Sequence, residues 1–81
     1  MKIKNQGKRN ERRYVVVIEK TKNNYGAYVP DLPGCVAVAK TKEELRRLIR
    51  EAIKLHIESL QEDGAAIPQP VTTSEYVEVR V

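Results

Sequence analysis

The sequence is poor in the residues that support several common classes of protein. It has one cysteine, one histidine, no tryptophan and no phenylalanine. A single cysteine excludes an internal disulfide, and a single histidine gives no basis for a zinc site built from several histidines. No apolar stretch approaches the roughly 20 residues that a membrane-spanning helix needs, and the first residues carry charges where a signal peptide has its apolar core. We therefore expect a cytoplasmic protein without a membrane partner.

The chain length permits one small domain with a single core. A folded chain of 81 residues buries only about 60% of the surface that it exposes when unfolded. Small domains of this kind often gain stability by associating with other chains. The sequence shows no internal repeat and no low-complexity segment. We predict one domain that forms a homodimer or a tetramer.

The net charge of +4 is unevenly distributed along the chain. Residues 1–13 carry six basic residues against one acidic residue, whereas residues 14–81 carry nine basic residues against ten acidic ones. The first segment has few apolar residues and no periodicity, which is typical of a flexible arm. We predict a flexible basic arm over residues 1–13 and a folded domain over residues 14–81. The arm's candidate contacts to nucleic acid are Lys8, Arg9, Arg12 and Arg13.

Three short strands are predicted in the first half of the domain. Residues 14–18 are mainly β-branched, and residues 25–29 and 35–39 are of similar length and character. Asn23 and Asn24 supply turn residues between the first two segments, which predicts a hairpin.

A second turn is predicted between the second and third strands. Asp31 opens it, and Pro33 and Gly34 suit the two central positions of a type II turn. The second central position requires a positive φ, which glycine adopts without strain. The three strands are therefore expected to form an antiparallel meander.

One helix is predicted to follow the meander. Thr41 can cap its first backbone N–H groups, and Glu44, three residues later, completes a capping box. Gly64 ends the helix. Apolar residues recur with a helical period at Leu45, Leu48, Ile49, Ala52, Ile53, Ile57 and Leu60.

The last part of the chain is predicted to form a fourth strand. Pro68 and Pro70 make an extended connector, and residues 75–81 then alternate between apolar and polar side chains. The predicted order is β-β-β-α-β. This is an α+β fold in which a three-stranded antiparallel meander and a C-terminal strand carry one packed helix.

The pattern of apolar residues indicates a surface that binds another protein chain. The first and third strands are apolar on both faces, yet one helix covers only one face of a sheet. The apolar arc of the helix is also wide, because Leu55 and Ile57 lie on opposite sides of it. Residue composition alone leaves another explanation open, in which small strands are valine-rich and the arm or connector covers the rest. The candidate interface residues are Val15, Val17, Leu55 and His56.

No group of residues predicts catalysis, a metal site or a bound cofactor. His56 lies within the apolar stripe of the helix, as packed histidines do, and Cys35 has no motif around it that would make it a nucleophile. The sequence has no phosphate-binding glycine loop and no nucleophile elbow. Surface solvation accounts for the candidate acidic residues, which are Glu19, Asp31, Glu44 and Glu51. We therefore expect a protein that is not an enzyme.

The ordered motifs of the domain resemble the HicB antitoxin family. The resemblance covers residues 14–81 and rests on YGAYVPDLPGC at residues 25–35, on the helix pattern, and on DGAAIPQP at residues 63–70. The helix pattern comprises Thr41, EEL at residues 43–45, EAI at residues 51–53, His56 and Glu58.

The resemblance implies a type II antitoxin that binds a HicA-type toxin, which is a small protein that cleaves messenger RNA. It also implies a reduced RNase H-like sheet without nuclease activity, and inhibition by occlusion of the toxin's active surface. Many family members carry a further C-terminal DNA-binding domain, and because this sequence ends at the predicted final strand we do not expect regulation by that route.

Two other functions stay open at this stage. The basic arm supports a nucleic-acid-binding regulatory protein, although no basic groove with interleaved aromatic residues is evident. The RNase H-like resemblance also leaves room for a vestigial nuclease.

Overall fold

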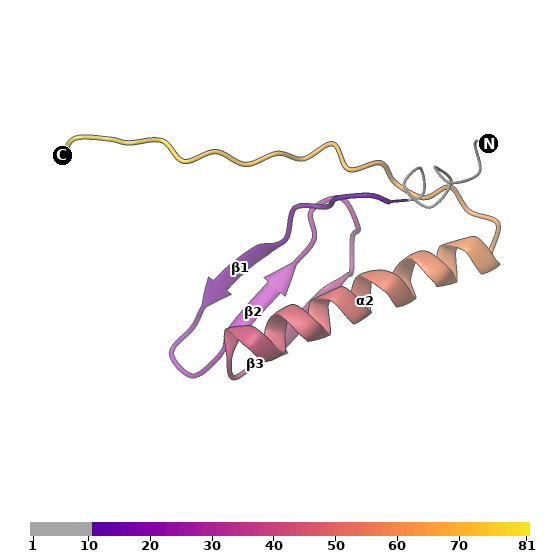
Figure 1. Cartoon of the computed structure of the whole chain (residues 1–81), viewed down its shortest axis with the longest axis horizontal. Coiled ribbons are helices and arrows are strands. Elements are labelled where there is room, and N and C mark those ends of the chain that lie inside the picture. The colour runs from indigo at the N-terminus through magenta and orange to yellow at the C-terminus, as the bar shows by residue number, and fades with distance from the viewer. Residues whose placement is uncertain (1–10) are drawn as a thin grey trace, which may run out of the picture.

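The computed structural model describes residues 11–81. Its elements are β1 (Val17–Lys20), β2 (Tyr25–Tyr28), β3 (Val36–Ala39) and α2 (Lys42–Glu62). The strands form one antiparallel sheet in the order β1-β2-β3, and α2 packs over β3 and β2 (Figure 1). This confirms the predicted α+β fold in its coarse form, a three-stranded meander with one helix on the sheet.

The first strand begins later than predicted. The ladder between β1 and β2 pairs Val17 with Tyr28 at one end and Lys20 with Tyr25 at the other. Residues 14–16 lie outside the ladder, because β2 ends at Tyr28 and has no residues left to pair with them. The β-branched composition of this segment is compatible with a strand, but the length of the partner decides which residues pair.

The hairpin between β1 and β2 closes at the predicted turn. The N–H of Thr21 donates to the carbonyl oxygen of Asn24 at 2.8 Å, and the N–H of Asn24 donates to the hydroxyl oxygen of Thr21 at 3.2 Å. These bonds fix the register of the two strands.

The turn between β2 and β3 has the predicted geometry. The N–H of Cys35 donates to the carbonyl oxygen of Leu32 at 3.0 Å, which places Pro33 and Gly34 at the two central positions. Gly34 has a φ of +86°, as a type II turn requires at its second central residue. The side chain of Leu32 is fully buried, so the turn also contributes to the core.

We expect Gly34→Val to destabilise the domain by about 1–3 kcal/mol, because a β-branched residue is strained at a positive φ. A Cβ atom at this position would meet no atom within 4 Å, so the cost comes from the backbone and not from a collision. Urea unfolding of both variants tests this, with Gly34→Asn as the control, since asparagine tolerates a positive φ. Equal midpoints for the two variants would contradict the backbone explanation.

The helix begins and ends where the sequence predicts. The N–H of Glu44 donates to the hydroxyl oxygen of Thr41 at 3.1 Å, which is one half of the predicted capping box. The other half does not form, because the Glu44 carboxylate lies 3.8 Å from Arg47 instead. At the other end, Gly64 has a φ of +69°, and the N–H of Ala65 donates to the carbonyl oxygen of Leu60 at 2.9 Å. This pattern ends a helix with a left-handed residue.

The core lies between α2, the inner face of the sheet and the turn. It is small and entirely apolar, which fits a domain of this length. Its buried members are Ala27, Val29, Leu32, Cys35, Ala39, Leu45 and Ile49.

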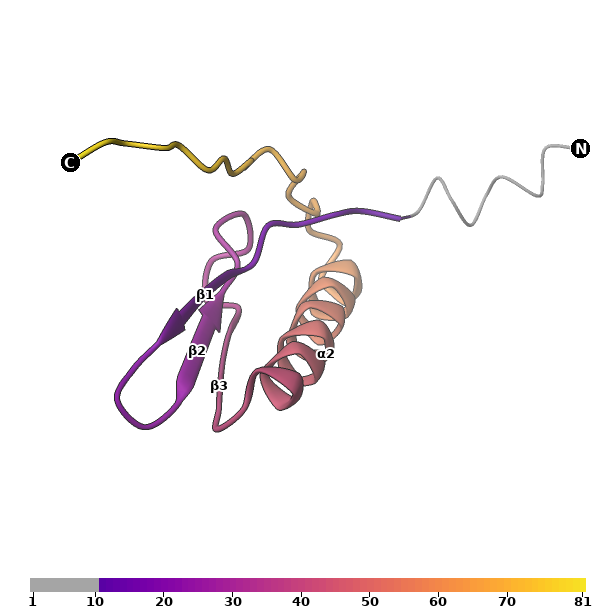
Figure 2. The same ribbon diagram turned by 60° about the vertical axis from the view of Figure 1, so that its left-hand side comes forward.

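The fourth strand predicted over residues 75–81 is not formed within the described chain. This stretch joins no ladder, and its backbone runs apart from the sheet in both ribbon views (Figures 1 and 2). Its valines are largely exposed, with Val77 at 75% and Val79 at 74%. The alternating residues can form a strand only where another strand supplies hydrogen-bonding partners, and none of the strands among residues 11–81 does so.

Candidate protein-binding surface

The outer face of the sheet, opposite α2, is mainly apolar and uncovered, with the exposed Glu19 on it in the row of Gly26 and Val38. The register brings Val17, Tyr28 and Val36 into one row across the three strands. Val36 and Val38 are each 61% exposed, and Tyr28 is 43% exposed. The inner face is different, because Ala27 and its neighbours are buried against the helix. We define the outer sheet face as the surface made by Val17, Tyr28, Val36 and Val38.

The structure divides the four predicted interface residues between two separate places. Val17 lies on the outer sheet face, whereas Val15 precedes β1 and lies outside the ladder, and both are half-buried. Leu55 and His56 lie on α2, which covers the opposite face, and Leu55 is 64% exposed. The structure therefore offers the outer sheet face as one continuous surface, with Leu55 as an isolated apolar residue elsewhere. Sequence analysis missed Tyr28, Val36 and Val38 as members of this surface, although strand alternation from Val17 could have found them.

Asp31 has a role that the sequence did not predict, because it anchors the segment that follows the helix. Its carboxylate accepts hydrogen bonds from the N–H of Thr72 at 3.0 Å and from the Thr72 hydroxyl at 2.8 Å. The backbone N–H of Thr72, followed by its hydroxyl, holds the pKa of the Asp31 carboxyl below its ordinary value. Nearby, the hydroxyl of Tyr14 donates to the carbonyl oxygen of Pro68 at 2.6 Å. Together these bonds fix the path of residues 68–72 beside the turn.

We expect the anchor between Asp31 and Thr72 to be complete at neutral pH and to weaken in acid. A carboxyl whose pKa is lower in the folded state stabilises that state above its unfolded pKa, about 3.9, and this contribution disappears as the pH falls through the lowered folded value. Nuclear magnetic resonance (NMR) should show the Thr72 amide shift titrating with a midpoint below about 3.9. The Asp31→Asn variant should lose this titration. A midpoint at or above the ordinary value in the wild type would disprove the anchor.

The residues considered for chemistry do not converge. Within residues 11–81, no group of three or more histidine, cysteine, aspartate or glutamate residues is placed to hold a metal ion. Cys35 is buried in the core, and burial raises the pKa of its thiol, which makes it a poor nucleophile. Glu44 and Glu51 both lie near Arg47 on the exposed side of the helix, at 3.8 and 3.9 Å. Glu19 is exposed on β1.

The predicted nucleic-acid contacts fall partly outside the described residues, since Lys8 and Arg9 lie there. Arg12 and Arg13 are exposed and line a cavity of about 530 Å³ between the segment before β1 and the helix. Arg46 and Arg50 of α2 line the same cavity. Sequence analysis missed this convergence, although the spacing of Arg46 and Arg50 by four residues already places them on one side of a helix.

Comparisons with known proteins agree with the observed fold. Among residues 11–81, no helix has the length and hydropathy that crossing a bilayer requires. The profile of the HicB_like antitoxin of bacterial toxin-antitoxin systems matches residues 14–80. A UPF0150 protein of Helicobacter pylori is 50% identical over 50 residues, which cover 62% of this chain and 69% of that protein. A UPF0150 protein of Thermoplasma acidophilum is 43% identical over 58 residues, covering 70% and 84%.

Two further relatives complete the comparison. An uncharacterized 14.9 kDa protein of Haemophilus phage HP1 is 36% identical over 64 residues, and the chain spans 48% of its length. The solved HicA3 and HicB3 toxin-antitoxin complex contains a chain with a TM-score of 0.64 and 32% identity, covering 74% of this chain and 70% of that one. The match over residues 14–80 spans most of the chain, and the fold agrees with it: the chain belongs to the family of HicB-like antitoxins of bacterial toxin-antitoxin systems.

Proposed function

We propose that this antitoxin neutralises a HicA-type, messenger-RNA-cleaving toxin in the cytoplasm by binding to the toxin's active surface. The observation that carries the proposal is the outer sheet face, where exposed Tyr28, Val36 and Val38 form an apolar surface that the helix leaves open. Exposed apolar patches of this kind usually mark contacts with other proteins. The structural similarity to a chain of a HicA–HicB complex supports a toxin of the same class as the partner.

The proposed mechanism is occlusion, without a chemical step by the antitoxin. Among the described residues, no three histidine, cysteine or acidic side chains come together as a metal site would require, and Cys35 is buried with a raised pKa. A rigid sheet that covers an active surface inhibits by excluding the substrate. We therefore propose that the antitoxin is not an enzyme.

Inhibition by occlusion should be stoichiometric and reversible. Purified antitoxin is titrated into a fixed amount of HicA-type toxin, and cleavage of labelled messenger RNA is followed. We expect activity to fall linearly and to reach zero near a fixed ratio of the two chains. Complete suppression by a tenth of an equivalent would show that the antitoxin acts catalytically. Degradation of RNA by the antitoxin alone would overturn the proposal that it is not an enzyme.

Nucleic-acid binding is a second candidate function, favoured by the four arginines that line one cavity. Each phosphate contact would steepen the dependence of affinity on salt by about 0.9 log units per log unit of salt. This function leaves the outer sheet face unexplained, because phosphate recognition does not require exposed valines. For that reason we place protein binding first.

A further inference from the structure

A groove separates β1 from the helix on the inner side of the sheet. The helix lies over β3 and β2, and β1 is the strand farthest from it (Figure 2). Val16 and Ile18 line this groove, where Val16 packs partly against the core and Ile18 is left 38% exposed. Ile49 and Ile53 form the opposite wall, and the cavity between the walls measures about 530 Å³. The groove thus has an apolar floor beside the unpaired backbone edge of β1.

The rim of the groove is strongly basic. Arg12, Arg13, Arg46 and Arg50 all line it. The ion pairs within residues 11–81 both involve Arg47, so none of the four rim arginines has an acidic partner in this part of the chain. A ligand that fits this groove needs apolar side chains for its floor and negative charge for its rim.

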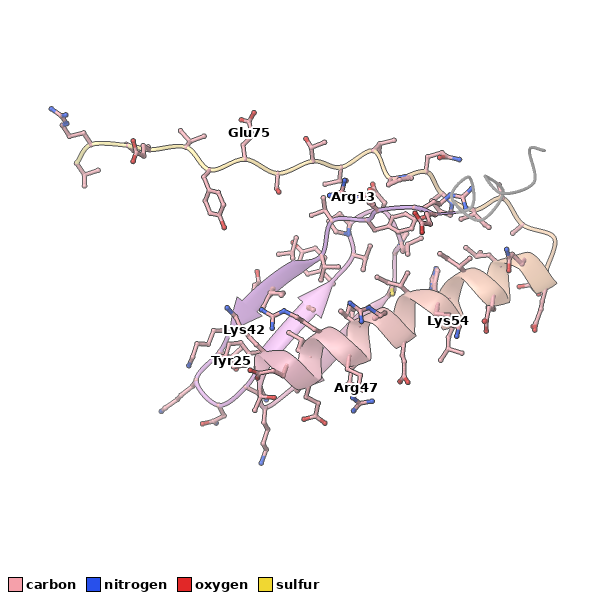
Figure 3. All side chains as sticks on the ribbon, viewed as in Figure 1. Arg13, Tyr25, Lys42, Arg47, Lys54 and Glu75 are labelled. Carbon is pink, nitrogen blue, oxygen red and sulfur yellow. The ribbon has the colours of Figure 1, made fainter. Side chains whose placement is uncertain are left out.

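Residues 75–81, which we call the tail strand, have both properties. Val77, Val79 and Val81 lie on one side of the alternation together with Glu75, which gives this side its negative charge, and Glu78 and Arg80 lie on the other side. The three valines are exposed, and Glu75 points away from the domain (Figure 3). The tail strand has seven residues, the same number as the segment from Arg12 to Ile18 that lines the groove.

We propose that the groove receives the tail strand of a second copy of this chain, added to the edge of β1. The valines would then cover Ile18 and Ile53, and Glu75, on the same side of the strand as the valines, would face the rim arginines. Pairing along β1 would also satisfy backbone groups that both segments leave without strand partners in this structure. A reciprocal exchange fills two grooves and closes a two-fold dimer.

The anchor at Thr72 explains why the tail strand belongs to another copy's groove. The bonds from Asp31 to Thr72 and from Tyr14 to Pro68 fix the start of the segment beside the turn. Beyond Thr72 the backbone runs away from its own sheet and forms no strand with it (Figure 1). This association uses the inner side of β1, so it leaves the outer sheet face free for a toxin and is independent of the proposed function.

Charge reversal tests the exchange in the full chain. Wild-type protein at micromolar concentration should have twice the chain mass by light scattering. Arg46→Glu with Arg50→Glu should raise the dimer dissociation constant on the order of tenfold or more, and Glu75→Arg should do the same. Each of these variants alone places like charges together, so an equimolar mixture of the two should regain the dimer. Arg47→Glu is the matched control, because Arg47 does not line the groove, and it should remain dimeric.

Hydrogen exchange separates the proposal from its alternatives. Backbone amides of residues 75–81 should be protected in the dimer and should lose protection on dilution. Protected amides in a protein of monomer mass would show that each tail strand folds into its own groove, which overturns the exchange. A dimer with unprotected tail amides would place the interface elsewhere and would overturn it too. If the wild type were monomeric, the exchange would be wrong. Loss of RNA binding or of toxin neutralisation in the variant with Arg46→Glu and Arg50→Glu would then show that the groove binds RNA or the toxin instead.

Discussion

Replacing Val36 and Val38 together by lysine is expected to abolish toxin neutralisation while the domain stays folded. Both side chains are 61% exposed on β3, an edge strand of the sheet, where lysine is well tolerated in the free protein. In a complex that covers the outer sheet face, the two ammonium groups would lose water without gaining partners. Desolvating an unpaired charge costs several kcal/mol, so a loss of about 3 kcal/mol corresponds to a roughly 100-fold rise in the dissociation constant.

The matched control for this variant is Leu55→Lys. Leu55 is as exposed as the two valines, at 64%, but lies on the helix at the other side of the sheet. It should neutralise the toxin as the wild type does, and circular dichroism should show all variants folded. Titration of each variant against toxin and labelled messenger RNA provides the measurement. If the double variant still inhibited the toxin fully, the outer sheet face would not be the toxin-binding surface. If Leu55→Lys lost inhibition, the helix would be part of that surface.

Local features of the fold could be predicted from the sequence because their causes are local. Gly34 follows Pro33 at the second central position of a type II turn, which requires a positive φ. The structure confirms this conformation at Gly34. Thr41 caps the helix and Gly64 ends it for similar reasons, since each acts on backbone groups within a few residues. The family resemblance drew on these same positions, and the match over residues 14–80 confirms it.

Features that depend on a partner could not be predicted in the same way. The composition of residues 14–18 predicts a strand over all five residues. In the structure, β2 has partners only for the residues of the first strand from Val17 onward, because β2 ends at Tyr28. Alternation over residues 75–81 predicts a strand, but it does not say which edge the strand joins or in which chain. Periodicity placed the polar and apolar sides of the helix correctly, yet the groove arises because the helix lies over β3 and not over β1. That offset is a property of tertiary packing and leaves no trace in a single strand or helix.

Leu45→Ala is expected to produce the largest loss of stability among single substitutions in the helix. Leu45 is fully buried, and it packs in a core that has only seven buried members, so neighbours cannot readily fill the space left by the removed atoms. Such a truncation costs about 2–5 kcal/mol, a large part of the 5–15 kcal/mol that stabilises a typical domain. Leu55→Ala makes the same chemical change on the same helix at an exposed position and should cost within about 0.5 kcal/mol. Urea unfolding of the two variants at equal protein concentration gives the difference directly. Similar losses in the free energy of unfolding at both positions would mean that an assembled form buries Leu55 as well. The side of the helix that carries Leu55 would then be an interface.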